Sequence, residues 1–222
     1  MNRLIAVIIV IILSVLSGCA HRAELNKQEK FLAAAPRSIL IVPVVNNSVD
    51  ITAADYLLST ITIPLAERGY YVFPVNMVKR LLEDDGLADS SLVHSAPASK
   101  LANLFGADAV LYITVQQWDA QYMVLSTRVT VALDYQIRDG RTDESLWSNK
   151  EKIVYMPDDG GGGGLGGLIA KAIVAAITKG LPNYMPLARQ ANDKALLTYP
   201  GKGIPLGPYA TEQKELSPGS RK

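Results

Sequence analysis

The chain has 222 residues and nearly balanced charges, with 22 Lys and Arg against 21 Asp and Glu and a formal net charge of +1. It has no basic stripe and no acidic tail, so the composition does not indicate binding to nucleic acid or to a strongly charged partner. The single cysteine excludes an intramolecular disulfide and a metal site built from several thiolates.

The first 18 residues have the anatomy of a secretory signal peptide. Arg3 precedes an almost uninterrupted apolar stretch over residues 4–16, which is shorter than the roughly 20 residues that cross a bilayer as a helix. The stretch ends in Leu-Ser-Gly-Cys, which resembles the lipobox of bacterial lipoproteins. That resemblance implies cleavage before Cys19 and acylation of Cys19, whereas the alternative is an ordinary signal peptide with an incidental cysteine.

A lipidated Cys19 would hold the protein on a membrane without a spanning helix, because several acyl chains together give stable anchoring. Ala20 follows the cysteine where an aspartate would resemble an inner-membrane retention signal. The predicted location is therefore the periplasm-facing side of an outer membrane, with surface exposure left open. Residues 19–35 are predicted to form the lipidated tether.

An α/β domain is predicted over residues 36–157. Residues 38–47 are predicted to form a buried strand, in which Pro43 marks a bulge or the strand end. A helix follows, with a capping box of Thr52 and Asp55 and a kink or split caused by Pro64.

Further elements alternate up to residue 115. A strand over residues 70–75 precedes a short helix over residues 77–83 and, after a polar loop, a helix over residues 98–105. The helix over residues 77–83 is expected to turn four apolar side chains inward, namely Met77, Val78, Leu81 and Leu82. A strand over residues 107–115 follows, and these crossovers are long enough for parallel pairing.

The pattern then changes to that of an antiparallel meander. Apolar and polar residues alternate over residues 128–137, Asp139-Gly140 signals a turn, and a last strand covers residues 145–155. The predicted fold class is α/β, with a mixed parallel and antiparallel sheet flanked by helices and a C-terminal helical extension.

The C-terminal third begins with a Gly-rich loop over residues 158–167. Its spacing formally fits G-x-G-x-x-G, but it comes after the sheet and lacks the strand-turn-helix context of a nucleotide site. A helical extension over residues 168–198 packs on the domain or on a partner subunit, and residues 199–222 form an irregular or disordered tail.

The segment over residues 165–177 is apolar nearly all round, so it must be buried. Three alternatives stay open: a core helix on its own sheet, a homo-oligomer interface, or membrane insertion after rearrangement. The candidate partner-binding residues are Leu168, Ile169, Ile173 and Ile177.

No constellation of catalytic residues is recognisable. His21 lies in the tether, and His94 is predicted to be solvated in a polar loop without a partner. The acidic runs over residues 83–85 and 143–144 are predicted to be solvated turns. The chain is therefore predicted to have no catalytic residue, no metal site and no cofactor, and not to be an enzyme.

Three segments together resemble a family of bacterial lipoproteins of unknown function: ILIVPVVNN, FGADAVLYITV and VALDYQIRDGRTDESLWSNKEK. That family is grouped with the curli secretion-channel lipoprotein. Its scaffold is similar to the N-terminal domain of the Tol-system translocation protein and to lipoprotein activators of penicillin-binding proteins. The resemblance covers residues 36–155 at the level of the fold and implies a role in envelope transport or assembly, although a fold alone does not carry function.

Two hypotheses follow. The first is a non-enzymatic, outer-membrane-anchored periplasmic lipoprotein that works in envelope transport, secretion or assembly through protein–protein contacts. Its expected partners are further copies of itself, as a homodimer or higher oligomer, other envelope lipoproteins or secretion components, and the membrane through the lipid anchor. The alternative is a regulatory lipoprotein that binds and activates a periplasmic cell-wall enzyme.

Overall fold

The computed structural model describes residues 29–123, 126–155, 184–198 and 203–210. A six-stranded sheet has the order β3-β1-β4-β5-β6, and β2 also pairs with β4. The strands are β1 (Ser38–Ile41), β2 (Val45–Asn46), β3 (Tyr71–Val72), β4 (Ala109–Met123), β5 (Ser126–Asp139) and β6 (Ser145–Tyr155). The helices are α2 (Ala53–Thr60), α3 (Thr62–Glu67), α4 (Val75–Asp84), α5 (Ser90–Ser95), α6 (Ala98–Phe105) and α8 (Met185–Leu197), and residues 29–34 are also helical.

The sheet is mixed, as predicted. β1 pairs in parallel with β3 and β4, and β2 pairs in parallel with β4. β4, β5 and β6 pair in antiparallel order. Helical crossovers join the parallel strands, whereas a short loop suffices between β5 and β6.

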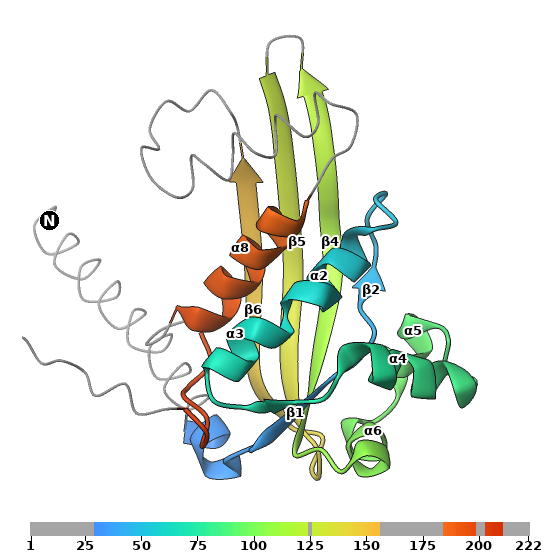
Figure 1. The fold of residues 1–222 in the computed structure, drawn as a ribbon, viewed down its shortest axis with the longest axis vertical. Coiled ribbons are helices and arrows are strands. Elements are labelled where there is room, and N and C mark those ends of the chain that lie inside the picture. The colour runs from blue at the N-terminus through green and yellow to red at the C-terminus, as the bar shows by residue number, and fades with distance from the viewer. Residues whose placement is uncertain (1–28, 124–125, 156–183, 199–202, 211–222) are drawn as a thin grey trace, which may run out of the picture.

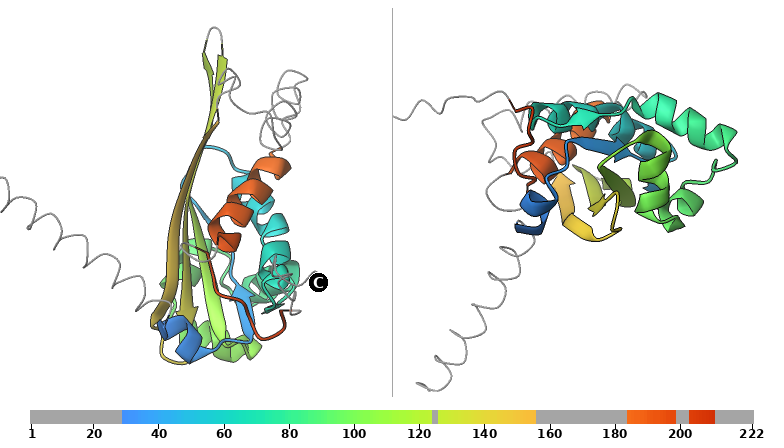
Figure 2. Two further views of the ribbon diagram at one scale, coloured as in Figure 1. Left: turned by 90° about the vertical axis from the view of Figure 1, so that its left-hand side faces the viewer. Right: turned by 90° about the horizontal axis from the view of Figure 1, so that it is seen from below.

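Helices cover the two faces of the sheet unequally. α2, α3 and α8 lie along one face, while α4, α5 and α6 lie on the other side near β1 and the start of β4 (Figures 1 and 2). The helices α2, α3 and α8 enclose the larger core against the sheet. This core includes Ile39, Ile41, Leu111 and Trp118. Leu40 and its neighbours on the opposite face form a second, smaller core with α4–α6. Burial on both faces explains the continuous apolar run of β1.

Pro43 interrupts the predicted first strand and separates β1 from β2. Ile41 pairs with Leu111, whereas Val45 pairs with Thr114, so the segment around Pro43 holds one residue more than its partner strand. Proline has no N–H to donate to the ladder, and an extra residue accommodates it. The predicted bulge or strand end at Pro43 is confirmed.

A bulge in β4 changes which of its side chains face the larger core. The pairing register with β5 shifts between Val115 and Gln117. Up to Val115 the odd-numbered residues face the larger core, and after the shift Trp118 does so, with 2% of its surface exposed. A regular strand would place Trp118 on the other face, because successive side chains alternate.

The helix predicted before Pro64 is two helices. α2 ends at Thr60 and α3 begins at Thr62, since the ring of Pro64 is incompatible with a continuous hydrogen-bond ladder to the Thr60 carbonyl. The predicted capping box is wrong. Thr52 makes no capping hydrogen bond with its side chain; its amide and its Oγ1 donate instead to Asp50 Oδ1, at 2.9 and 2.6 Å.

Two expectations for the segment over residues 75–97 are wrong. Met77 and Leu81 are 47% and 45% exposed, because α4 buries only the narrow stripe of Val78 and Leu82. The predicted polar loop contains α5, whose first turn is capped where the Ser91 amide donates to the Asp89 carboxylate at 2.7 Å.

The C-terminal part of the chain returns onto the domain. α8, the described part of the predicted extension, packs against α2, α3 and β6. Residues 203–210, which we call the strap, have no helix or strand, yet Ile204 is fully buried. The amides of Gly207 and Tyr209 donate to the carbonyls of Arg68 and Gly69, at 2.7 and 3.0 Å. This stretch of the predicted tail is therefore packed rather than disordered. Within the described residues, no helix is long and apolar enough to cross a membrane.

Candidate functional site

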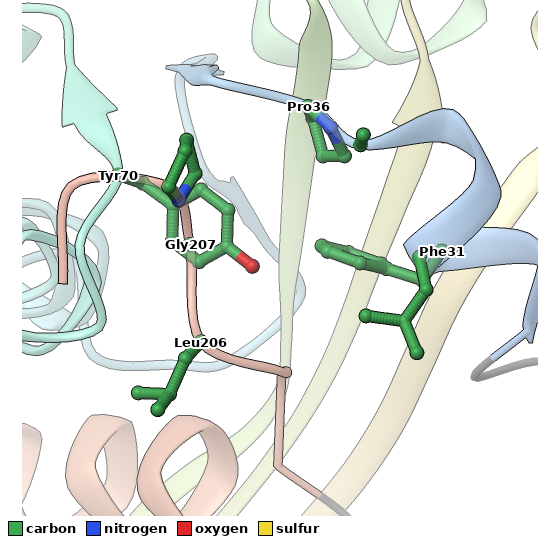
Figure 3. Close-up of a pocket in the computed structure, with 8 residues that line it drawn as sticks. Phe31, Pro36, Tyr70, Leu206 and Gly207 are labelled. Carbon is green, nitrogen blue, oxygen red and sulfur yellow. The ribbon is translucent and has the colours of Figure 1, made fainter. Parts of the chain in front are cut away.

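An apolar groove of about 190 Å³ lies where the chain enters β1 and β3 (Figure 3). Residues from three distant parts of the sequence form its walls. We call it the tether-end groove; its lining is Phe31, Leu32, Ala35, Pro36, Tyr70, Leu206, Gly207 and Pro208.

The first wall is the short helix that leads into β1. The Ala35 amide closes this helix on the Phe31 carbonyl at 3.1 Å, and Ala35 itself has a positive φ of 43°. This left-handed residue redirects the chain into the sheet. Phe31 is buried and meets the Tyr70 ring edge-on, with 6.2 Å between the centroids.

The second wall is the strap, held close to the turn before β3. The Tyr70 hydroxyl donates to the Pro205 carbonyl at 3.0 Å. A Cβ at Gly207 would lie 2.4 Å from the Gly69 carbonyl oxygen, so a side chain at position 207 would collide with backbone. Glycine is required there because two chain segments approach each other closely.

The rim of the groove is partly exposed and amphipathic. Leu32 and Leu206 expose 56% and 61% of their surface. Beside them, Arg37 Nη2 donates to the Tyr209 hydroxyl at 3.0 Å, and the guanidinium lies 5.6 Å from the centre of the same ring. The one hydroxyl in the lining, that of Tyr70, is already bonded. The groove therefore suits an apolar group and offers no side chain for acid–base chemistry.

A second exposed apolar feature lies at the opposite ends of the parallel strands. We call residues 46–52 the distal loop; it begins at the last residue of β2, whereas the groove precedes β1 (Figure 1). Val49 and Ile51 are 86% and 87% exposed there. Between them, Asp50 organises the loop: its carboxylate accepts from Thr52, and its carbonyl accepts from Asn46 Nδ2 at 2.7 Å.

His94 is not the solvated loop residue that the sequence predicts. Its Nε2 donates to the Pro43 carbonyl at 3.0 Å, and its ring meets Tyr112 edge-on at 5.1 Å. Burial lowers the pKa of His94. It also raises the pKa of Tyr112 to about 12. The prediction of a solvated His94 is wrong because α5 brings His94 back over the chain between β1 and β2.

The Tyr112 hydroxyl is buried without a hydrogen-bond partner among the described residues. The guanidinium carbon of Arg138 lies 5.5 Å from the centre of the Tyr112 ring.

The acidic runs differ from each other. Residues 83–85 are exposed, as predicted. Asp143 is only half exposed: its Oδ1 accepts the amide of Ala98 at 2.9 Å, at the start of α6, and pairs with Arg138 at 3.5 Å. Asp143 therefore caps a helix and is not merely solvated. Across the part of the chain that the structure describes, no group of three or more His, Cys, Asp or Glu side chains could hold a metal ion.

The remaining predicted site residues lie outside the described residues. They are Cys19, Leu168, Ile169, Ile173 and Ile177. Sequence reasoning missed both apolar features. The distal loop had a signal, since Val49 and Ile51 stand in an otherwise polar turn. The groove had none, because residues near positions 31, 70 and 206 become neighbours only after folding.

The fold defines a mixed α/β domain with flanking helices and a C-terminal helix. The sequence model of the family described as "Putative lipoprotein GNA1162-like" matches residues 28–209. The chain belongs to this family. Membership supports attachment to a membrane by lipid, and the family has no known catalytic activity.

Two lipoproteins of Neisseria meningitidis agree with this assignment. The "Putative lipoprotein NMB1124/NMB1162" of Neisseria meningitidis serogroup B is 34% identical over 201 residues, which are 90% of this chain and 93% of that protein. The crystal structure of lipoprotein GNA1162 from Neisseria meningitidis is 35% identical and has a TM-score of 0.55, over 65% of this chain and 99% of that one. A PelC dodecamer from Paraburkholderia phytofirmans is 17% identical, with a TM-score of 0.41, over 68% of this chain and 87% of that one.

Proposed function

We propose that this protein is a non-enzymatic lipoprotein, anchored through Cys19 on the periplasm-facing side of an outer membrane. It works in envelope transport, secretion or assembly through protein–protein contacts. Family membership supports the lipoprotein part of the proposal. The observation that carries the protein-contact part is the distal loop, where Val49 and Ile51 are held almost fully in solvent.

The distal loop is shaped before any partner arrives. The Ser48 amide and hydroxyl donate to Asn46 Oδ1 at 3.0 and 2.7 Å, and Thr52 donates twice to Asp50 Oδ1. A loop fixed in this way loses little conformational entropy on binding. Burying each of the two exposed aliphatic side chains would contribute about 1.5–3 kcal/mol.

The position of the tether suits this use of the loop. At about 3.3–3.6 Å for each fully extended residue, residues 20–28 would set an upper limit of roughly 30 Å on the distance from Cys19 to the start of the first described helix. That helix lies at the beginning of β1, and the distal loop lies at the other end of the parallel strands. An anchored molecule therefore keeps its groove near the membrane and can present Val49 and Ile51 away from it.

Site-specific photo-crosslinking in cells that express the full chain tests the proposal. A photoreactive amino acid replaces Ile51 in one variant and Ile63 of α3, which is 53% exposed, in a matched control. We expect a discrete protein adduct from position 51 that disappears when Val49 is also changed to Ser. Equal adduct patterns from positions 51 and 63, or none from position 51, would contradict a contact at this loop.

A further inference from the structure

We propose that the tether-end groove binds a fatty acyl chain of a phospholipid in the membrane that carries the protein. The inference rests on the proposed anchoring through Cys19. It adds a lipid-binding site at the opposite end of the parallel strands from the protein-binding loop.

The lining matches the chemistry of an acyl chain. Phe31, Leu32, Leu206 and the prolines contribute carbon surface, and the Tyr70 hydroxyl is satisfied by the Pro205 carbonyl. A polar or charged ligand would lose water there and gain no side-chain hydrogen bond. An apolar cavity of about 150 Å³ takes up a benzene molecule, so a groove of about 190 Å³ has room for several methylene groups.

The groove also lies where lipid is available. Phe31 and Leu32 lie in the helix over residues 29–34, inside the predicted tether, and the chain from Cys19 limits their distance from the anchor to roughly 35 Å. At the rim, Tyr209 is 55% exposed and is joined to the exposed Arg37. Tyrosine favours the level of lipid headgroups, and an arginine side chain can place its charge among them while its stem stays on apolar surface.

A phospholipid chain fits better than one of the acyl chains on Cys19. Stable anchoring takes more than one buried chain, so withdrawing an anchor chain into the groove would weaken the hold on the bilayer. A bilayer phospholipid has no such role, and many copies surround the tether. The proposal therefore commits to phospholipid.

The test uses the full lipidated chain in vesicles of phosphatidylethanolamine and phosphatidylglycerol with a small fraction of phospholipid that has a photoreactive acyl chain. Labelled peptides are identified by mass spectrometry. Leu206→Asp places a charge on the groove wall. Leu104→Asp is the matched control, because Leu104 is 54% exposed on α6, which precedes β4 at the same end of the sheet, and is not part of the groove lining.

We expect labelling of peptides that contain Phe31 to Pro36 and Leu206 to Pro208. Leu206→Asp should lower this labelling about tenfold, whereas Leu104→Asp should leave it unchanged. Equal labelling around Leu104, or labelling that survives Leu206→Asp, would overturn the proposal. Circular dichroism of both variants checks that they remain folded.

A second arm separates this inference from the proposed anchoring. The unanchored chain of residues 20–222, which lacks both the signal peptide and Cys19, is mixed with a monomeric short-chain photoreactive phospholipid. Groove labelling there supports the site even if Cys19 is not the anchor. Labelling that stays at the level of Leu206→Asp overturns the site even if the anchor and the distal-loop contacts are confirmed.

Discussion

Asn192 is the polar side chain that ties α8 to the sheet and to α2. It is fully buried, and its Oδ1 accepts from the Tyr135 hydroxyl at 2.9 Å. Its Nδ2 donates to Thr60 Oγ1 at 2.9 Å and to the Leu57 carbonyl at 3.3 Å. The Tyr135 ring is also buried, and burial raises the pKa of its hydroxyl, which stays protonated as a donor. Every group in this network has a partner, so removing one leaves others unsatisfied.

We expect Asn192→Ala to lower the free energy of unfolding by about 2–4 kcal/mol, because it strands the Tyr135 hydroxyl and opens a small cavity. Urea denaturation measures the change. Arg189→Ala on the same helix is the control for helix substitution, since Arg189 is exposed. A loss for Asn192→Ala no greater than that of the control would contradict the role of the network.

His94 should make the folded state sensitive to mild acid. Burial lowers its pKa below the ordinary value of 6.5, so below that pH the unfolded chain binds the proton more readily than the folded chain. The free energy of unfolding must then fall as the pH falls from about 6.5 toward the folded-state pKa. Above pH 6.5 both states are neutral at His94 and the effect is absent.

The measurement is urea denaturation between about pH 7.5 and pH 5.5, for the native chain and for His94→Gln, which keeps a donor for the Pro43 carbonyl. The native chain should lose more stability on acidification than the variant. Parallel curves for the two proteins would show that His94 does not contribute to the pH dependence.

Among the elements, the strap depends on the turn before β3. Gly69 has a φ of +85°, and a Cβ there would lie 1.9 Å from the Ala210 amide nitrogen. The strap closes one wall of the tether-end groove and buries Ile204. The backbone conformation of Gly69, just after the end of α3, therefore affects where the strap packs and so the shape of the groove.

Gly69→Ala should displace the strap and destabilise the protein by more than about 1–2 kcal/mol, since left-handed backbone strain adds to a backbone collision. Gly86→Ala is the matched control, because Gly86 has a φ of +83° and nothing within 4 Å of an added Cβ. Hydrogen exchange should show faster exchange at Gly207 and Tyr209 in Gly69→Ala only. Equal exchange in both variants would mean that the contact with Gly69 does not hold the strap.

Among the described strands, β6 lies at an edge of the sheet and has features that oppose pairing with another sheet. Lys150 and Lys152 are exposed along it, and the buried Glu151 between them pairs with Lys194 of α8. Exposed lysines and inward charges are common protections of sheet edges. Self-association by addition of strands at β6 is therefore disfavoured.

For the whole molecule, we propose self-association through the predicted apolar helix that includes Ile169, Ile173 and Ile177, together with Leu168. These residues lie outside the described part of the chain. Light scattering coupled to size exclusion, on residues 20–222, should give a defined oligomer. Changing the three isoleucines to Ser should reduce it to a folded monomer, because burial of their side chains stabilises the interface. A native monomer whose variant unfolds would make the helix ordinary core and favour the regulatory lipoprotein hypothesis.

The sequence alone was sufficient for features that depend on neighbours in the chain. Alternation along β5 and β6 indicated strands with one buried face, and the apolar run of β1 indicated burial on both faces. Pro43 and Pro64 predicted their interruptions because a missing N–H and a fixed φ act locally. The lipobox resemblance agrees with the lipoprotein family of the chain.

The tertiary structure decided what depends on contacts between distant segments. The bulge in β4 sends Trp118 into the core, α5 brings His94 onto the Pro43 carbonyl, and the strap completes the tether-end groove. Local propensity contains no information on which segments meet. Burial, and with it the pKa of His94 and the shape of the groove, exists only once the segments have packed together.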